Sequence, residues 1–362
     1  MPVLQRILWV EPGRGLPPNS PEDGCSLRKG DTVRYAKTWK SYADQLDQLI
    51  ARGMIVTDRD RALDHLERIG YYRLSGYWFP FRARSGPVCL LDALGRKPEI
   101  FREERIALDS FRDGATFQDA VDLYVFDKQL RLMVMDALER LEVAVRADVS
   151  HTLGALDRFA YLRTDLFHED FSVKLDQKTG LTRHLDLLAK HAQLIGRSRE
   201  EFVRHNRAKY GLPLAIWVAC EVWDFGTLST LYGGMREAEQ DGIARQYGVR
   251  NGRVFATWLR SLNYLRNVCA HHGRLWNRNV VDQPRLPPAS EVAWVMPLES
   301  NTHARARCFV LLKIARHLLA VINPRSEWPE RMKAHLLGFP DLSHLGINLS
   351  GLGASPGWES DW

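Results

Sequence analysis

The stretch FQDAVDLYVFDKQLRLMVMDALERLEVAVR, residues 117–146, decides the fold class of this chain of 362 residues. Its apolar residues recur every three or four positions, which is the period of an α-helix with one buried face. Opposite charges stand four residues apart within it, and such pairs support an exposed helix face; they are Asp127/Arg131, Asp136/Arg140 and Glu142/Arg146. We therefore predict one long helix over residues 116–153.

The helical period continues on both sides of this stretch. Upstream, one helix is expected to end at Arg52-Gly53 and a second to begin after a cap at Asp58. Downstream, the pattern predicts helices over residues 181–195, 199–210, 213–232, 236–247, 254–272 and 303–322. Strand alternation is absent from the sequence of residues 116–322, so the chain is predicted to be mainly α, with an up-and-down helical bundle.

Breaks in the helical pattern divide the sequence into four parts. Residues 1–30 are rich in proline and glycine and are predicted to be a flexible lead-in. Residues 31–115 are predicted to form a small N-terminal helical module with a short irregular or partly β insertion at 83–115. The helical bundle then occupies residues 116–322, and residues 323–362 form a C-terminal tail.

The segment GYYRLSGYWFPFR, residues 70–82, concentrates aromatic side chains between two predicted helices. Such a cluster usually forms a local core, because aromatic rings bury large apolar surfaces. The alternative is a platform on which RNA bases stack. We favour the local core.

Composition excludes several classes of protein. A hydrophobic share of 45% excludes extensive disorder, and no run of about 18 apolar residues predicts a membrane span. The five cysteines stand far apart, so neither a disulfide framework nor a zinc site is expected, and a cytoplasmic protein without cofactor or metal fits best. The motifs GxxxxGK[ST], GxGxxG, HExxH and GxSxG are absent, which argues against nucleotide hydrolases, dehydrogenases, zinc proteases and α/β-hydrolases.

Candidate chemistry lies in LRSLNYLRNVCAHHGRLWNR, residues 259–278. On a helix, one side of this segment is apolar, and the opposite side carries Asn263, Arg266, Asn267, Ala270, His271 and Arg274. Gly273 is the expected C-cap. A histidine can give or take a proton near neutral pH, and arginine stabilises charge on a phosphate. The alternative is a buried structural histidine beside a surface arginine.

The spacing Arg-x4-His is too short to identify a site by itself, because it occurs three times in this sequence. We interpret Arg146 as the partner of Glu142 and His151 as a surface residue of the same helix. We assign no role to Arg163/His168. The third pair, Arg266/His271, differs because Asn267 and Ala270 share its polar face and a second histidine follows.

Several long blocks resemble the Abi-like family of bacterial phage-defence proteins, of the AbiD/AbiF type. They are residues 70–82 and 117–146, LPLAIWVACEVWDFGTLSTLY at 212–232, residues 258–278, and HLLGFP at 335–340. The resemblance implies a branch of the HEPN superfamily, whose fold is an up-and-down helical bundle. Its ribonucleases carry an Arg-x4–6-His motif, which here matches Arg266, Asn267 and His271 as catalytic residues.

The resemblance implies an endoribonuclease of abortive infection that cleaves RNA without a metal to give a 2′,3′-cyclic phosphate and a 5′-hydroxyl. We expect Asn263, His272, Arg274 and Arg278 to bind the RNA, and the active unit to be a homodimer without membrane contact. A structured non-coding RNA is a further expected partner. The alternatives are a non-catalytic module that holds a non-coding RNA and a helical scaffold in which Arg266 and His271 are structural.

Overall fold

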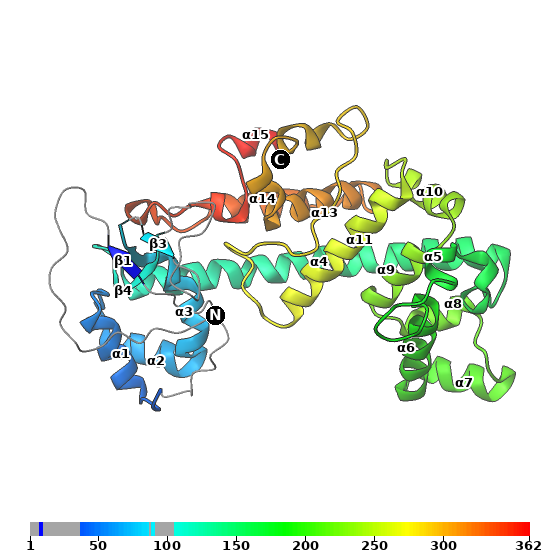
Figure 1. Cartoon of the computed structure of the whole chain (residues 1–362), viewed down its shortest axis with the longest axis horizontal. Helices are drawn as coiled ribbons and strands as arrows, with labels where there is room; N and C mark the ends of the chain where they lie inside the picture. The colour runs from blue at the N-terminus through cyan, green and yellow to red at the C-terminus, as the bar shows by residue number, and fades with distance from the viewer. Residues whose placement is uncertain (1–6, 10–36, 87, 91–104) are drawn as a thin grey trace. The chain divides into compact units, whose positions relative to one another are not determined.

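The computed structural model describes residues 7–9, 37–86, 88–90 and 105–362, and these are mainly helical, as predicted (Figure 1). The predicted lead-in, residues 1–30, lies outside the described residues except at 7–9. No described helix is long and apolar enough to cross a membrane. The chain divides into two compact units, the first formed by residues 1–124 and 342–346 and the second by residues 125–341 and 347–362.

The first unit joins three short helices to two small antiparallel sheets. Its elements are β1 (Ile7–Trp9), α1 (Tyr42–Ala51), α2 (Arg59–Ile69), α3 (Tyr71–Trp78), β2 (Arg82–Arg84), β3 (Val88–Leu90) and β4 (Ala107–Phe111). β1 pairs with β3, with Ile7 opposite Leu90, and β2 pairs with β4, with Arg82 opposite Phe111. The predicted β character of the insertion is therefore confirmed at β2 and β4.

Local signals set the ends of these helices. The Asp58 carboxylate accepts the backbone N–H of Arg61 at 2.9 Å and caps α2, as predicted. Gly70, at φ 92°, ends α2 and starts α3, a conformation that favours glycine. In the aromatic segment Tyr77, Trp78 and Phe81 are buried, which confirms a local core there.

The regular elements of the second unit are helices, joined by irregular segments such as residues 271–292. The long helix α4 (Phe117–Leu156) crosses the boundary between the units, and the other helices are α5 (Glu169–Ser172), α6 (Arg183–Arg197), α7 (Glu201–Tyr210), α8 (Ile216–Ala219), α9 (Phe225–Gly234), α10 (Glu237–Gln246), α11 (Gly252–Ala270), α12 (Thr302–Arg305), α13 (Cys308–Ile322), α14 (Trp328–Leu337) and α15 (Trp358–Asp361). Helix α11 packs against α9, α10 and α13. This places its apolar side in the core, where Phe255, Trp258, Leu262 and Leu265 are almost fully buried.

Two helices predicted as continuous are each broken in two. The segment 213–232 divides before α9, because the Asp224 carboxylate accepts the backbone N–H of Thr227 at 2.8 Å and starts a new helix. The segment 303–322 divides between α12 and α13. There the Ala306 carbonyl accepts the N–H of Val280 at 2.8 Å instead of continuing a helical ladder.

Residues predicted as a C-terminal tail contain ordered and buried structure. They include α14 and α15, and Trp328 at the start of α14 is fully buried. Its indole Nε1 donates to the carbonyl of Met133 on α4 at 2.7 Å. This contact covers the middle of α4 within the second unit.

Candidate active site

The three predicted catalytic residues lie on the last two turns of α11. The apolar side of the helix is buried, which turns the opposite side outward, with Arg266 half-buried and Asn267 and His271 exposed. Arg266 Nη1 donates to Asn267 Oδ1 at 3.4 Å, so these two side chains meet. His271 is exposed, so the alternative of a buried structural histidine is wrong.

The end of α11 differs from the prediction that Gly273 is its C-cap. The C-cap is His271, and His272 takes the left-handed conformation at φ 55°. The N–H of His272 donates to the Cys269 carbonyl at 3.0 Å and the N–H of Gly273 to the Val268 carbonyl at 2.7 Å. These two bonds form a Schellman motif, in which glycine is the usual left-handed residue. A histidine therefore holds a position where a side chain adds strain.

A buried carboxylate fixes the segment that follows this helix end. Asp127 Oδ1 accepts the backbone N–H of Trp276 at 2.7 Å and that of Leu275 at 3.1 Å. Asp127 also forms an ion pair with Arg131, whose guanidinium donates to the Gly273 carbonyl at 3.4 Å. Asp127 and Arg131 were predicted on an exposed helix face, and this prediction is wrong because both are buried.

The residues predicted to bind RNA surround the same helix end. Asn263 is half-buried, and its side chain lies against Gly226 of α9. A Cβ atom added to Gly226 would lie 3.4 Å from the Asn263 amide. Arg278 is exposed, and its Nε donates to the Tyr264 hydroxyl on α11 at 3.0 Å. His272 is exposed and Arg274 is half-buried, and both lie in the segment that follows the last helical residue of α11.

Glu142 of α4 is close enough to Arg266 to feel its charge. The sequence predicted Glu142 only as the ion-pair partner of Arg146. The predicted pair with Arg146 is confirmed at 2.8 Å, and both side chains are largely buried, at 17% and 13% exposure. Arg146 also donates to the Trp223 carbonyl at 3.1 Å. Burial raises the pKa of Glu142, and the positive charges of Arg146 and Arg266 oppose that rise.

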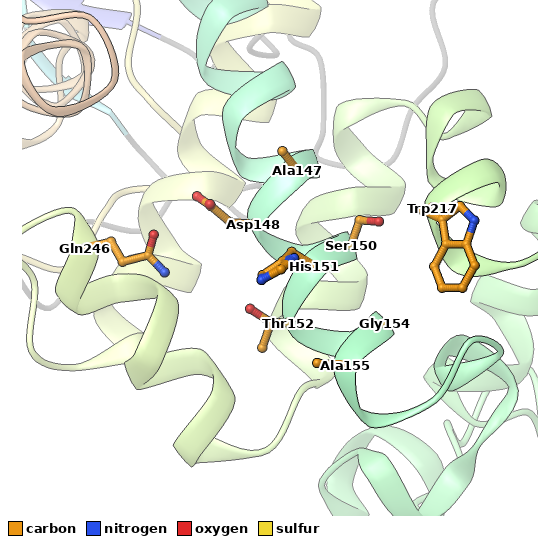
Figure 2. Close-up of a pocket in the computed structure, with 9 residues that line it drawn as sticks. All are labelled: Ala147, Asp148, Ser150, His151, Thr152, Gly154, Ala155, Trp217 and Gln246. Carbon is orange, nitrogen blue, oxygen red and sulfur yellow. The ribbon is translucent and has the colours of Figure 1, made fainter.

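A separate pocket of about 710 Å³ surrounds His151 (Figure 2). Figure 2 shows His151 on α4, with Asp148 and Gln246 on one side and Trp217 on the other. Burial raises the pKa of the Asp148 carboxyl, which accepts the Tyr247 hydroxyl at 2.5 Å. The described lining of this pocket includes no arginine or lysine, so it offers a phosphate no permanent cation.

Neither of the other two Arg-x4-His pairs presents an arginine and a histidine together. Arg146 points toward Glu142 and the Trp223 carbonyl and does not line the pocket of His151. Arg163 pairs with Asp157 and Asp165, while His168 Nε2 lies 2.9 Å from the Gly233 carbonyl. Of the three pairs, Arg266/His271 alone combines an exposed histidine with an arginine that carries no described carboxylate ion pair.

Comparison with known proteins gives one family assignment. The model of the family described as Abi-like protein matches residues 64–277, which is more than half of the chain. Comparisons with curated proteins and with solved structures find no significant match. The matched region includes Glu142, Arg146, Arg266 and His271 and ends just after the Schellman motif of α11. The chain belongs to the Abi-like protein family.

Proposed function

We propose that this Abi-like protein is a metal-independent endoribonuclease of abortive infection, with a HEPN-type site formed by Arg266, Asn267 and His271. The observation that carries the proposal is the outer face of α11. An exposed histidine ends the helix, and an arginine five residues earlier lies on the same polar side, opposite a buried apolar side. Family membership supports the role in abortive infection.

The proposed chemistry is a transesterification within the RNA strand. His271 accepts the proton of a 2′-hydroxyl as that oxygen bonds to the adjacent phosphorus, and the bond from phosphorus to the 5′-oxygen breaks. Arg266 stabilises the negative charge that develops on the phosphoryl oxygens, and Asn267 orients the Arg266 guanidinium through their hydrogen bond. The products are a 2′,3′-cyclic phosphate and, once the leaving oxygen gains a proton, a 5′-hydroxyl.

Protonation of the leaving oxygen requires a second acid, and we assign it to His271 of a second copy. Two exposed histidines follow Arg266, but His272 has left the helix at φ 55°, so the polar face of α11 carries His271 as its one histidine after Arg266. A two-fold axis beside Ala270, which has a small side chain, would bring two Arg266/His271 pairs across one RNA strand. Because both copies of His271 are required, an excess of His271→Ala subunits is then expected to suppress cleavage by wild-type subunits, since each mixed dimer lacks one of the two histidines.

The direct test is cleavage of total bacterial RNA by the purified protein in the presence of EDTA. We expect Arg266→Ala and His271→Ala each to reduce the rate by about 10²–10⁴-fold, the usual contribution of such groups. His151→Ala is the matched control, because it removes an exposed histidine of the same spacing and is expected to cleave at the wild-type rate. Circular dichroism verifies that each variant is folded. Wild-type rates in both site variants would refute the assignment.

The second candidate function is a module that binds RNA without cleaving it. The observation that favours it is that the His271 ring has no hydrogen-bond partner among the described residues, so nothing within one chain orients it as a base. Such a module would retain RNA in a gel-shift assay and produce no 2′,3′-cyclic phosphate. The same variants would then weaken RNA binding alone.

A further inference from the structure

A cationic pocket lies on α13, and its described lining includes none of the candidate active-site residues. It has a volume of about 270 Å³, and its lining includes Trp294, Lys313, Arg316, Asn323, Ser326 and Glu330. Helix α11 packs against α13, which begins at Cys308. Lys313 and Arg316 lie five and eight residues further along α13, about 7 to 12 Å at the helical rise.

Lys313 is buried without an anionic partner. Its side chain is 5% exposed, and its Nζ lies 5.9 Å from the centre of the Trp294 ring. Across the ranges that the structure describes, Lys313 forms neither a hydrogen bond nor an ion pair, although Asp361 exerts a longer-range attraction. Burial lowers the pKa of Lys313. The side chain is largely enclosed, yet Lys313 lines the pocket, so its ammonium can meet an anionic ligand there.

The other polar groups of the pocket leave its cationic character intact. Arg316 forms no described carboxylate pair, and its Cζ lies 5.8 Å from the Trp362 ring. The only carboxylate in the described lining is that of Glu330, which is exposed. Asn323 and Ser326 add groups able to hydrogen-bond with phosphate oxygens. Two cations and one peripheral carboxylate therefore face the pocket.

The indole of Trp294 is fixed at the edge of this pocket. Its Nε1 donates to His317 Nδ1 at 3.4 Å, because an indole N–H can only donate. His317 then carries its proton on Nε2, which donates to the Tyr247 carbonyl at 2.8 Å. Burial lowers the pKa of His317, which agrees with a neutral ring. The indole is thereby oriented, and an oriented aromatic ring offers a stacking surface to a base.

We propose that this pocket binds the phosphate monoester of a nucleotide, with Lys313 and Arg316 binding the phosphate and the Trp294 indole stacking against the base. The volume of about 270 Å³ lies just below the usual range for small-molecule sites, which begins at about 300 Å³, so the pocket has room for at most one nucleotide and not for a longer strand. The phosphate supplies the negative charge that Lys313 lacks. The same monoester can come from a free nucleotide or from the phosphorylated 5′ end of an RNA. This binding does not depend on the proposed cleavage.

Calorimetric titration of the full chain carrying His271→Ala, which the proposed function makes inert, tests this pocket without cleavage. The titrants are AMP, adenosine, a short RNA with a 5′-phosphate and the same RNA with a 5′-hydroxyl. We expect AMP to bind at least about tenfold more tightly than adenosine, since charge-assisted bonds account for the difference. Binding of AMP alone identifies a free nucleotide as the source, and an equal preference for the phosphorylated RNA identifies the RNA end.

Variants decide whether the named side chains do the binding. Lys313→Met and Arg316→Gln are each expected to weaken AMP binding by about tenfold or more, and Lys313→Arg to retain it within a few-fold. Lys178→Met and Arg199→Gln make the same changes at exposed positions outside the pocket and are expected to have no effect. Replacement of a buried charge by an apolar side chain often leaves stability unchanged; if Lys313→Met fails to fold, Arg316→Gln decides.

Two results would overturn the proposal. One is a wild-type pocket that binds AMP no more tightly than adenosine. The other is AMP binding that Lys313→Met and Arg316→Gln leave at the wild-type strength. Failure of RNA cleavage by the wild-type chain has no bearing on either measurement, so the two proposals fail separately.

Discussion

At the residue scale, His272 directly follows the C-cap of α11 and adopts a backbone conformation that is unfavourable for a residue with a side chain. Its φ of 55° lies in the left-handed region, and the two hydrogen bonds of the Schellman motif hold it there. Most side chains add steric cost in this conformation, whereas glycine does not. The strained residue directly follows the proposed catalytic His271, a place where strain of this kind often accompanies function.

Replacement of His272 tests this backbone conformation. We expect His272→Gly to be more stable to urea than His272→Ala by about 1 kcal/mol, because both remove the imidazole and only glycine relieves the left-handed strain. The comparison of the two variants isolates the backbone from any contact of the ring. Equal free energies of unfolding for the two variants would show that residue 272 is not left-handed in solution.

At the scale of elements, Asp127 connects α4 to the segment that follows α11. Its carboxylate accepts two backbone N–H groups of that segment and pairs with Arg131 in a buried site. Buried charges of this kind are stabilising only while every partner is present. Asp127 therefore positions the helix end that carries His271 and His272.

Removal of this carboxylate is expected to destabilise the protein strongly. Asp127→Ala should lose about 3–5 kcal/mol of unfolding free energy, because it removes the carboxylate that compensates the buried Arg131 charge. The double variant Asp127→Ala, Arg131→Met should recover part of that loss, since the charge is gone. The amides of Leu275 and Trp276 remain without their acceptor in both variants.

Hydrogen exchange distinguishes the positioning role from general stability. We expect the Leu275 and Trp276 amides to exchange faster than in the wild type even in the double variant, because their acceptor is missing. The matched control is Asp136→Ala, which removes a carboxylate from a half-exposed i,i+4 pair on the same helix. Wild-type protection of both amides in the double variant would refute the positioning role.

At the scale of the whole molecule, buried neutral histidines couple the fold to pH. Burial lowers the pKa of His191, His317 and His335 below the usual 6.5. Below pH 6.5 these histidines are therefore protonated in the unfolded chain while they are still largely neutral in the folded chain. Stability is fully present above about pH 6.5 and is lost as the pH falls toward the folded-state values.

Urea unfolding between pH 7 and pH 5 measures this coupling. We expect the wild-type free energy of unfolding to fall across this range, and His317→Gln to show a shallower fall, because one of the three histidines is removed. The buried carboxyls of Glu142 and Asp148, whose pKa values are raised, act in the opposite direction, so the comparison with the variant isolates His317. An unchanged slope in His317→Gln would contradict the prediction.

The sequence by itself determined the helical class, most helix positions and the motif face. The period of residues 117–146 predicted α4, and the period of 254–272 predicted α11 to within two residues at each end. These features depend on interactions between residues three or four apart, which a single sequence displays directly. The same helical period predicted that Arg266 and His271 lie opposite the buried side of α11.

Only the tertiary structure decided which charged groups are buried and what they contact. Asp127/Arg131 and Asp136/Arg140 have the same spacing, yet the first pair is buried under the segment after α11 and the second is partly exposed. Lys313 is one of three polar positions in α13, with Arg316 and His317, and residues distant in sequence enclose it. Burial of a charge depends on which segments, distant in sequence, pack over it. The spacing of apolar residues within one helix does not indicate which segments those are.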